Sequence, residues 1–172
     1  MLSIASIFLS VLLASASPAR REICSLDFQG KNISITNGQF EAGFSSNGLT
    51  LVSRPISTAV SEFTAQPVIS HSSGEFKLFN ATEGLFLTNT GAALPEMSPL
   101  GSPISGAQNW VFNCASCTPE GSPGNMFIGE GCFVISQLDQ RCLNISDAAP
   151  VNSPVTLGDC GAIGQSINIY TA

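Results

Sequence analysis

Short runs in which apolar and polar residues alternate recur along the chain from residue 33 to residue 169. Alternation with a period of two places every second side chain on one face, which is typical of a half-buried β-strand. Helical spacing is nearly absent after residue 21, because Gly or Pro interrupts every candidate stretch within three turns. The pattern predicts an all-β sandwich or barrel. The expected strands are Ile33–Ile35, Leu49–Leu51, Phe76–Leu78, Leu85–Leu87, Trp110–Phe112, Phe133–Ile135, Val155–Leu157 and Ile167–Ile169.

The order of these apolar runs repeats along the chain. A unit that begins at Phe76 closes with a Gln-x-apolar element at Trp110, and a similar unit runs from Cys132 to Ile167. In both units a second apolar run follows the first after about ten residues. Self-similarity of this kind determines the architecture more strongly than local propensity does.

A fainter first copy of the unit extends from Cys24 to Phe63, so that three units of about fifty residues fill the chain after residue 21. Three four-stranded units predict a β-trefoil, which is a closed barrel capped by hairpins around a pseudo-threefold axis. Closure removes the open strand edges along which β-proteins aggregate. We therefore expect Phe63, Trp110 and Ile167 at equivalent core positions, where burial of each contributes about 1.5–3 kcal/mol or more.

The first residues form an uninterrupted run of apolar and small side chains, followed by Ala14-Ser15-Ala16. This predicts a secretory signal peptide over residues 1–16. A membrane anchor fits less well, because the run is shorter than the roughly 20 residues that span a bilayer. Arg20-Arg21 is a candidate second cleavage site, which would make residues 17–21 a short propeptide and residues 22–172 the folded domain.

Charged residues make up only 10% of the chain and hydrophobic residues 44%, so a disordered polyelectrolyte is excluded. After both cleavages, four basic residues would remain against twelve acidic ones, which gives a net charge of 4 − 12 = −8. Because nucleic-acid binding requires clustered Lys and Arg, we expect no nucleic-acid partner. The mature chain is also expected to have no membrane span.

All six cysteines follow the predicted signal, and an even number in an oxidising compartment predicts three disulfides. Cys142 and Cys160 bracket a loop of turn-forming residues, and a bond that closes it would contribute about 3 kcal/mol. Zinc and redox roles are disfavoured, because no second close pair accompanies the Cys-x-x-Cys motif and turn residues follow it. The sequence leaves open the partners of Cys24, Cys114, Cys117 and Cys132.

Three Asn-x-Ser/Thr triplets begin at Asn32, Asn80 and Asn144. In a chain that enters the secretory pathway they predict N-linked glycans, and they require these asparagines to face solvent.

The last unit resembles a ricin B-type lectin repeat through Cys142-Leu143-Asn144, the segment Val155–Cys160 and Gln165-Ser166-Ile167. Gln108-Asn109-Trp110 is an intact closing motif of the same kind, and in style the chain is similar to small secreted ricin B-like proteins of fungi. The resemblance implies a β-trefoil that binds carbohydrate without catalysis.

In that family an Asp accepts hydrogen bonds from sugar hydroxyls, and an aromatic ring stacks on the sugar. The Asp position corresponds here to Asn144 in the last unit and Thr88 in the middle unit. The aromatic position corresponds to Gly158 in the last unit, and falls near Gly101 and Arg54 in the others. No unit keeps both parts, so the resemblance implies that the galactose-type site is absent or altered.

The candidate carbohydrate-binding residues are therefore Asn144, Asp147 and Gln165, with turn and core-closing roles as the alternative. A glycan on Asn144 would crowd its own site.

No catalytic residues, metal site or cofactor are expected. His71 lies among serines in a turn-like segment, and neither a Gly-x-Ser-x-Gly elbow nor a phosphate-binding loop occurs. Glycans are the expected partners. The alternative is a protein-binding β-trefoil, such as a protease inhibitor or secreted effector, that acts through the loops Gly91–Gly101 and Thr118–Gly124.

Overall fold

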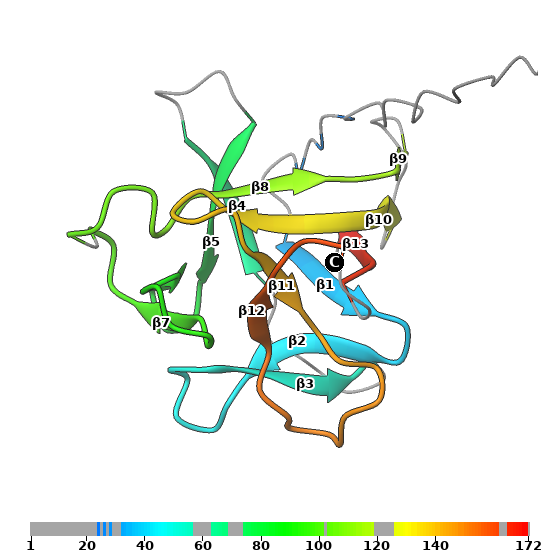
Figure 1. Cartoon of the computed structure of the whole chain (residues 1–172), viewed down its shortest axis with the longest axis horizontal. Coiled ribbons are helices and arrows are strands. Elements are labelled where there is room, and N and C mark those ends of the chain that lie inside the picture. The colour runs from blue at the N-terminus through cyan, green and yellow to red at the C-terminus, as the bar shows by residue number, and fades with distance from the viewer. Residues whose placement is uncertain are drawn as a thin grey trace, which may run out of the picture.

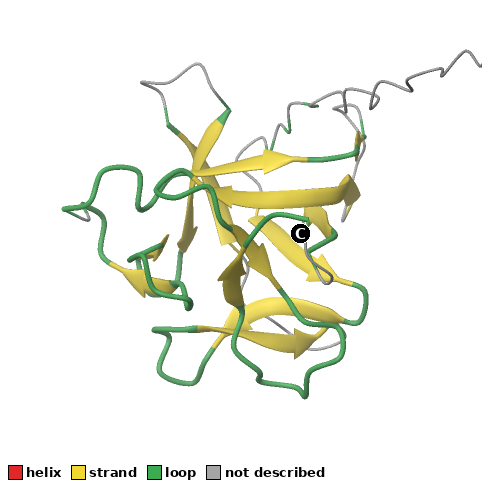
Figure 2. Cartoon of the chain, in the orientation of Figure 1, coloured by secondary structure: helices red, strands yellow, loops and turns green. Residues whose placement is uncertain are grey.

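The strands follow the alternating runs of the sequence. The structure is a computed structural model that describes residues 24, 26, 28, 32–56, 63–68, 74–101, 103–118, 126–161 and 165–171. Within these residues there are strands and turns but no helix (Figure 2). The predicted signal peptide, the propeptide and His71 lie outside the described residues.

The strands are β1 (Asn32–Asn37), β2 (Phe40–Phe44), β3 (Leu51–Pro55), β4 (Phe63–Pro67), β5 (Glu75–Asn80), β6 (Leu85–Thr88), β7 (Glu96–Ser98), β8 (Trp110–Asn113), β9 (Ser116–Cys117), β10 (Met126–Ser136), β11 (Cys142–Asn144), β12 (Thr156–Gly158) and β13 (Ile167–Thr171).

Six of these strands close into a barrel through antiparallel pairs (Figure 1). Around the ring, β1 pairs with β4, β4 with β5, β5 with β8, β8 with β10, β10 with β13, and β13 with β1. A hairpin extends from each unit: β2–β3, β6–β7 and β11–β12. Three four-stranded units around one barrel confirm the predicted β-trefoil, to which β9 adds a short strand beside β10.

The three hairpins are joined to one another by backbone hydrogen bonds. Each bond runs from a strand of one hairpin to the loop of another, so the hairpins form one continuous cap over an end of the barrel. The bonds are Met97 N to Leu49 O at 2.9 Å, Leu157 N to Ala93 O at 2.7 Å, and Ser53 N to Ser153 O at 2.8 Å.

The predicted core residues lie where the repeat places them. Phe63, Trp110 and Ile167 are the first residues of β4, β8 and β13, and they are 1%, 0% and 0% exposed. The Trp110 indole N–H donates to the Leu87 carbonyl at 3.0 Å, which satisfies the one polar group of this buried ring.

The strand register places the start of the first unit at β1 rather than at Cys24. Trp110 pairs with Phe76 and Ile167 pairs with Cys132, and the equivalent partner of Phe63 is Ile33. The predicted first copy therefore began too early. Residues 26 and 28 are apolar at alternate positions, as in a β-strand, and both are buried. They pack against the barrel without pairing in a sheet.

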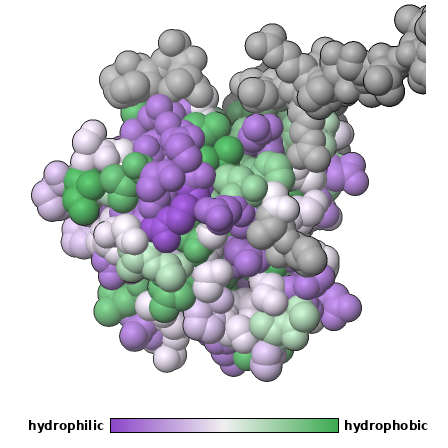
Figure 3. Space-filling model, in the orientation of Figure 1, coloured by the Kyte–Doolittle hydropathy of each residue, from purple (hydrophilic) through white to green (hydrophobic). Residues whose placement is uncertain are grey.

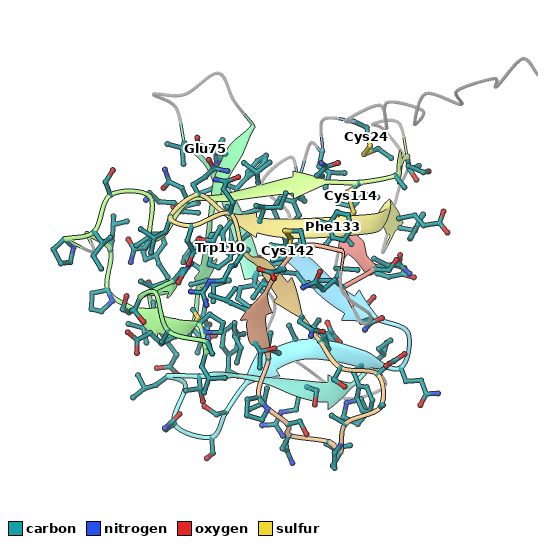
Figure 4. All side chains as sticks on the ribbon, viewed as in Figure 1. Cys24, Glu75, Trp110, Cys114, Phe133 and Cys142 are labelled. Atoms are coloured by element: carbon teal, nitrogen blue, oxygen red, sulfur yellow. A yellow bond between two sulfur atoms is a disulfide. The ribbon has the colours of Figure 1, made fainter. Side chains whose placement is uncertain are left out.

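Three disulfides join all six cysteines, which confirms the predicted disulfide-bonded fold. Cys114–Cys132 lies in the core and connects the second unit to the third, with both cysteines 0% exposed. Cys142–Cys160 closes the third hairpin, and Cys160 is exposed. The remaining bond is Cys24–Cys117 (Figure 4).

Candidate functional site

The candidate site lies on one face of the third hairpin, which is formed by β11 and β12. Asn144 is the last residue of β11 and pairs with Thr156, while Gly158 pairs with Cys142. Because side chains alternate along a strand, these four residues share one face. The intervening residues, which include Leu143, point into the core.

Gln165 packs against this face. It is 0% exposed and precedes β13 by two residues. Its side-chain nitrogen Nε2 is 3.6 Å from the position that a Cβ atom would occupy at Gly158. The fold therefore brings Gln165 and the β11–β12 hairpin together from segments separated along the chain.

Asn144 is half-buried, and its carbonyl oxygen Oδ1 is buried without a hydrogen-bond donor among the described residues. Burying an acceptor in this way costs about 1–3 kcal/mol. A half-turn of the amide exchanges Oδ1 with Nδ2 and directs the acceptor toward the opposite side.

Asp147, the third candidate, lies in the exposed loop after β11. No hydrogen bond among the described residues joins it to the other two candidates. The structure therefore brings Asn144 and Gln165 to one hairpin and leaves Asp147 at its edge.

The middle unit closes the equivalent position with its own side chains. Gln108 Nε2 donates to Thr88 Oγ1 at 3.1 Å and to the Pro99 carbonyl at 2.8 Å. The hydroxyls of Thr88 and Ser98 are 2.6 Å apart, and Gly101 N donates to Gln108 Oε1 at 3.1 Å. Every polar group of this cluster thus has a partner inside the fold.

The register corrects one of the positions that the resemblance assigned to the aromatic ring. Thr36, Phe79 and Ile135 are equivalent barrel positions, and their hairpin partners are Glu41, Phe86 and Cys142. These partners pair in turn with Arg54, Ser98 and Gly158, so Gly158 corresponds to Arg54 in the first unit, as expected, and to Ser98 rather than a residue near Gly101 in the middle unit. None of the three is aromatic. The third unit differs from the middle one in that Gly158 stands at the position of Ser98, whose hydroxyl contacts Thr88 in the middle unit.

Solved structures show where this architecture occurs among known proteins. No protein-family model and no curated protein matches the sequence. The designed threefold-symmetric protein ThreeFoil matches with a TM-score of 0.58 at 9% identity, over 81% of this chain and 97% of its own. SeviL, solved bound to the asialo-GM1 saccharide, matches with a TM-score of 0.56 at 12% identity over 83% and 98%. This chain shares its fold with β-trefoil lectins.

A further β-trefoil match is the Polyporus squamosus lectin bound to a human-type influenza-binding epitope. Its TM-score is 0.57 at 15% identity, over 84% of this chain and 50% of the lectin. Identities this low establish the common fold alone.

The β-trefoil exposes its three glycosylation triplets unequally. Asn32 is exposed, and its Oδ1 accepts a hydrogen bond from Thr64. Asn80 is only 4% exposed, so the expectation that it faces solvent is wrong. It is the last residue of β5, points inward, and accepts a hydrogen bond from Thr82 N at 2.9 Å within the following turn. Glycans at the other two asparagines stay predictions.

Sequence reasoning missed a polar cluster on the barrel wall, which we call the Asn109 cluster: Glu75, Lys77 and Asn109. Lys77 Nζ donates to Asn109 Oδ1 at 3.0 Å, and Asn109 Nδ2 donates to Glu75 Oε2 at 2.8 Å. Alternation in β5 could have predicted that Glu75 and Lys77 face outward. The contribution of Asn109 depends on pairing between distant segments.

A second polar group lies nearby, where β10 ends. Arg141 Nη2 is 2.7 Å from Asp139 Oδ2, and the buried Asn89 donates to Asp139 Oδ1 at 2.8 Å. Desolvation raises the pKa of Asp139, but these hydrogen bonds and the nearby guanidinium outweigh it and hold the pKa below its usual value. Figure 3 shows hydrophilic side chains gathered over this part of the barrel wall.

The described residues contain no group of three His, Cys, Asp or Glu side chains arranged to hold a metal. Nor does this part of the chain contain a helix long and apolar enough to cross a bilayer.

Proposed function

We propose that this protein is a secreted, non-catalytic carbohydrate-binding module with one altered sugar site in its third unit. The observation that carries the proposal is the contrast between the units. The middle unit satisfies its own polar groups, whereas in the third unit Asn144 Oδ1 is buried beside Gln165 without a donor among the described residues. A half-turn of the amide would direct this oxygen toward the other side of the half-buried Asn144, where a sugar hydroxyl is a donor of the required kind.

In this site the Asn144 amide would both accept hydrogen bonds from adjacent sugar hydroxyls and donate hydrogen bonds to them. Gln165 would form the base of the site. A neutral amide lacks the charge assistance of a carboxylate. The glycine at position 158 also provides no ring for the apolar face of a sugar. We therefore expect weak binding, with a Kd on the order of millimolar.

The fold supports this function, because β-trefoil lectins solved with saccharides share it. Three disulfides and the amino-terminal apolar run support secretion.

A glycan array with enzymatically deglycosylated, folded protein tests the proposal. We expect binding that Asn144→Ala removes and that Gly158→Trp strengthens. An added Cβ at Gly158 meets only Gln165 Nε2, at an ordinary contact distance of 3.6 Å, so the backbone at this position accepts a side chain. Thr64→Ala, on β4 of the barrel, is the matched control. No binding to any glycan on the array, or binding that Asn144→Ala leaves unchanged, would contradict the proposed site.

A second candidate function is protein binding through the two loops that flank β7. Leu94, before β7, is 43% exposed, and Leu100 and Ile104, after β7, are 61% and 43% exposed. Large apolar side chains exposed in neighbouring loops are typical of a protein-binding surface. The other candidate loop, Thr118–Gly124, lies outside the described residues except for Thr118. Inhibition of a protease panel, lost on Leu100→Ser, would favour this function over the lectin.

A further inference from the structure

The outer face of β5, β8 and β10 places charged, amide and apolar side chains side by side. Glu75 pairs with Val111, and Val111 pairs with Ile135, so these three residues form a row across the three strands. All three are partly exposed. Asn109 directly precedes β8 and lies beside Lys77 of β5. On the side of β10, its backbone carbonyl accepts a hydrogen bond from Gln137 N.

The Asn109 amide holds the two charged side chains apart. Its oxygen accepts from the Lys77 ammonium at 3.0 Å, and its nitrogen donates to the Glu75 carboxylate at 2.8 Å. Among the described residues no carboxylate lies within 4.0 Å of the ammonium. A cation, an amide and a carboxylate are therefore fixed in one row on the barrel wall. Because these side chains are already ordered, ligand binding would cost less conformational entropy.

We propose that the Asn109 cluster is a second saccharide site, separate from the third hairpin, that binds neutral sugars through adjacent hydroxyls. An ammonium only donates, a carboxylate only accepts, and each sugar hydroxyl does both. One hydroxyl of a vicinal pair accepts from Lys77 while its neighbour donates to Glu75. Val111 contacts the apolar C–H face of the ring. This proposal rests on the proposed function for its ligand class, carbohydrate. It uses none of the residues of the site on the third hairpin.

The balance of charged side chains around the Asn109 cluster favours a neutral ligand. Lys77 and Arg141 are balanced by Glu75 and Asp139, so this part of the wall is close to neutral in a chain of net charge −6. A polyanion would be repelled by the domain as a whole, and a basic peptide would find no local excess of negative charge. Figure 3 shows a hydrophilic area beside an apolar one on this side of the molecule, and Figure 4 shows Glu75 at the wall.

An NMR titration of isotope-labelled protein with lactose, cellobiose and chitotriose tests the second site. We expect shifts of backbone amides at residues 75–77 and 109–111 in the native protein and in Asn144→Ala. Lys77→Met and Asn109→Ala should each weaken this binding at least about fivefold. Gln66→Ala, an exposed change on the strand next to Lys77, is the matched control and should leave binding unchanged. Fluorescence of Trp110 verifies that each variant is folded.

The other outcomes separate the two proposals. Shifts confined to residues 142–158 that Asn144→Ala abolishes would overturn the second site and leave the proposed function intact. No shift at either place with any sugar would overturn both. Tighter binding of a heparin tetrasaccharide or an oligolysine peptide to residues 75–77 would refute the neutral-ligand assignment.

Discussion

Two disulfides of equal span allow chain entropy to be separated from packing. Cys114–Cys132 and Cys142–Cys160 each join residues 18 positions apart. The loop-closure estimate is therefore the same for both bonds, about 3 kcal/mol at 25 °C. Their surroundings differ, because both sulfurs of the first bond are in the core while Cys160 is exposed.

The core bond also contributes packing. A Cβ built at Gly129 would lie 2.8 Å from the Cys132 sulfur and 3.0 Å from the Cys114 sulfur, so these sulfurs fill the space beside that glycine. Replacing both cysteines by Ala leaves a void, which adds on the order of 1–2 kcal/mol. We expect Cys142→Ala/Cys160→Ala to lower the free energy of unfolding by about 3 kcal/mol. Cys114→Ala/Cys132→Ala should lower it by about 4–5 kcal/mol.

Equilibrium unfolding in guanidinium chloride without reductant provides the measurement. The chain has one tryptophan, Trp110, and its complete burial makes its fluorescence a direct probe of the core. The m-values must be compared as well, because a lost cross-link changes the surface exposed on unfolding. Equal losses in the two double variants would show that packing around the core bond contributes nothing. A larger loss for Cys142→Ala/Cys160→Ala would refute the reasoning.

Three further predictions concern single residues. Trp110→Phe removes the indole N–H and leaves the Leu87 carbonyl without its donor, so chemical denaturation followed by circular dichroism should show a loss of about 1–3 kcal/mol. Gly129→Ala should destabilise by about 1–3 kcal/mol in the same assay, because the added methyl meets two disulfide sulfurs that cannot move aside. The lowered pKa of Asp139 means that its contribution to stability is present above its unfolded pKa of about 3.9 and is lost as pH falls through the lower folded value. The difference in urea midpoint between native protein and Asp139→Asn should therefore shrink below about pH 4, and a difference that grows toward low pH would contradict this sign.

The fold followed from local sequence pattern where alternation and spacing acted together. Trp110 and Ile167 were predicted as core residues because each closes a repeat and begins an alternating run, and both are fully buried. The start of the first unit was wrong because Leu26 and Phe28 are apolar at strand spacing. Phe28 packs edge-on against Phe76 and Phe112, so it is buried by tertiary contact without pairing in a sheet.

The site was predictable only in part, because its contacts join distant segments. Gln165 and Asn144 were inferred from the resemblance, and the return of the chain beneath the third hairpin brings them together. The solvent exposure of Asn80 was misjudged, since a glycosylation triplet contains no information on which face of a strand the asparagine occupies. The Asn109 cluster was missed because the register that places residue 109 beside residue 77 is set by closure of the whole barrel.

Barrel closure also has a consequence for biosynthesis. The last strand, β13, fills the position between β1 and β10, so the first and last described strands are direct neighbours (Figure 1). A nascent chain emerges from its amino end, and β1 therefore has no partner on this side until residue 171 has been translated. The ring can be completed only after residue 171 has emerged from the ribosome. Until then the interior residues of the growing chain stay accessible to chaperones, and early stop codons that remove β13 would release an open, aggregation-prone sheet.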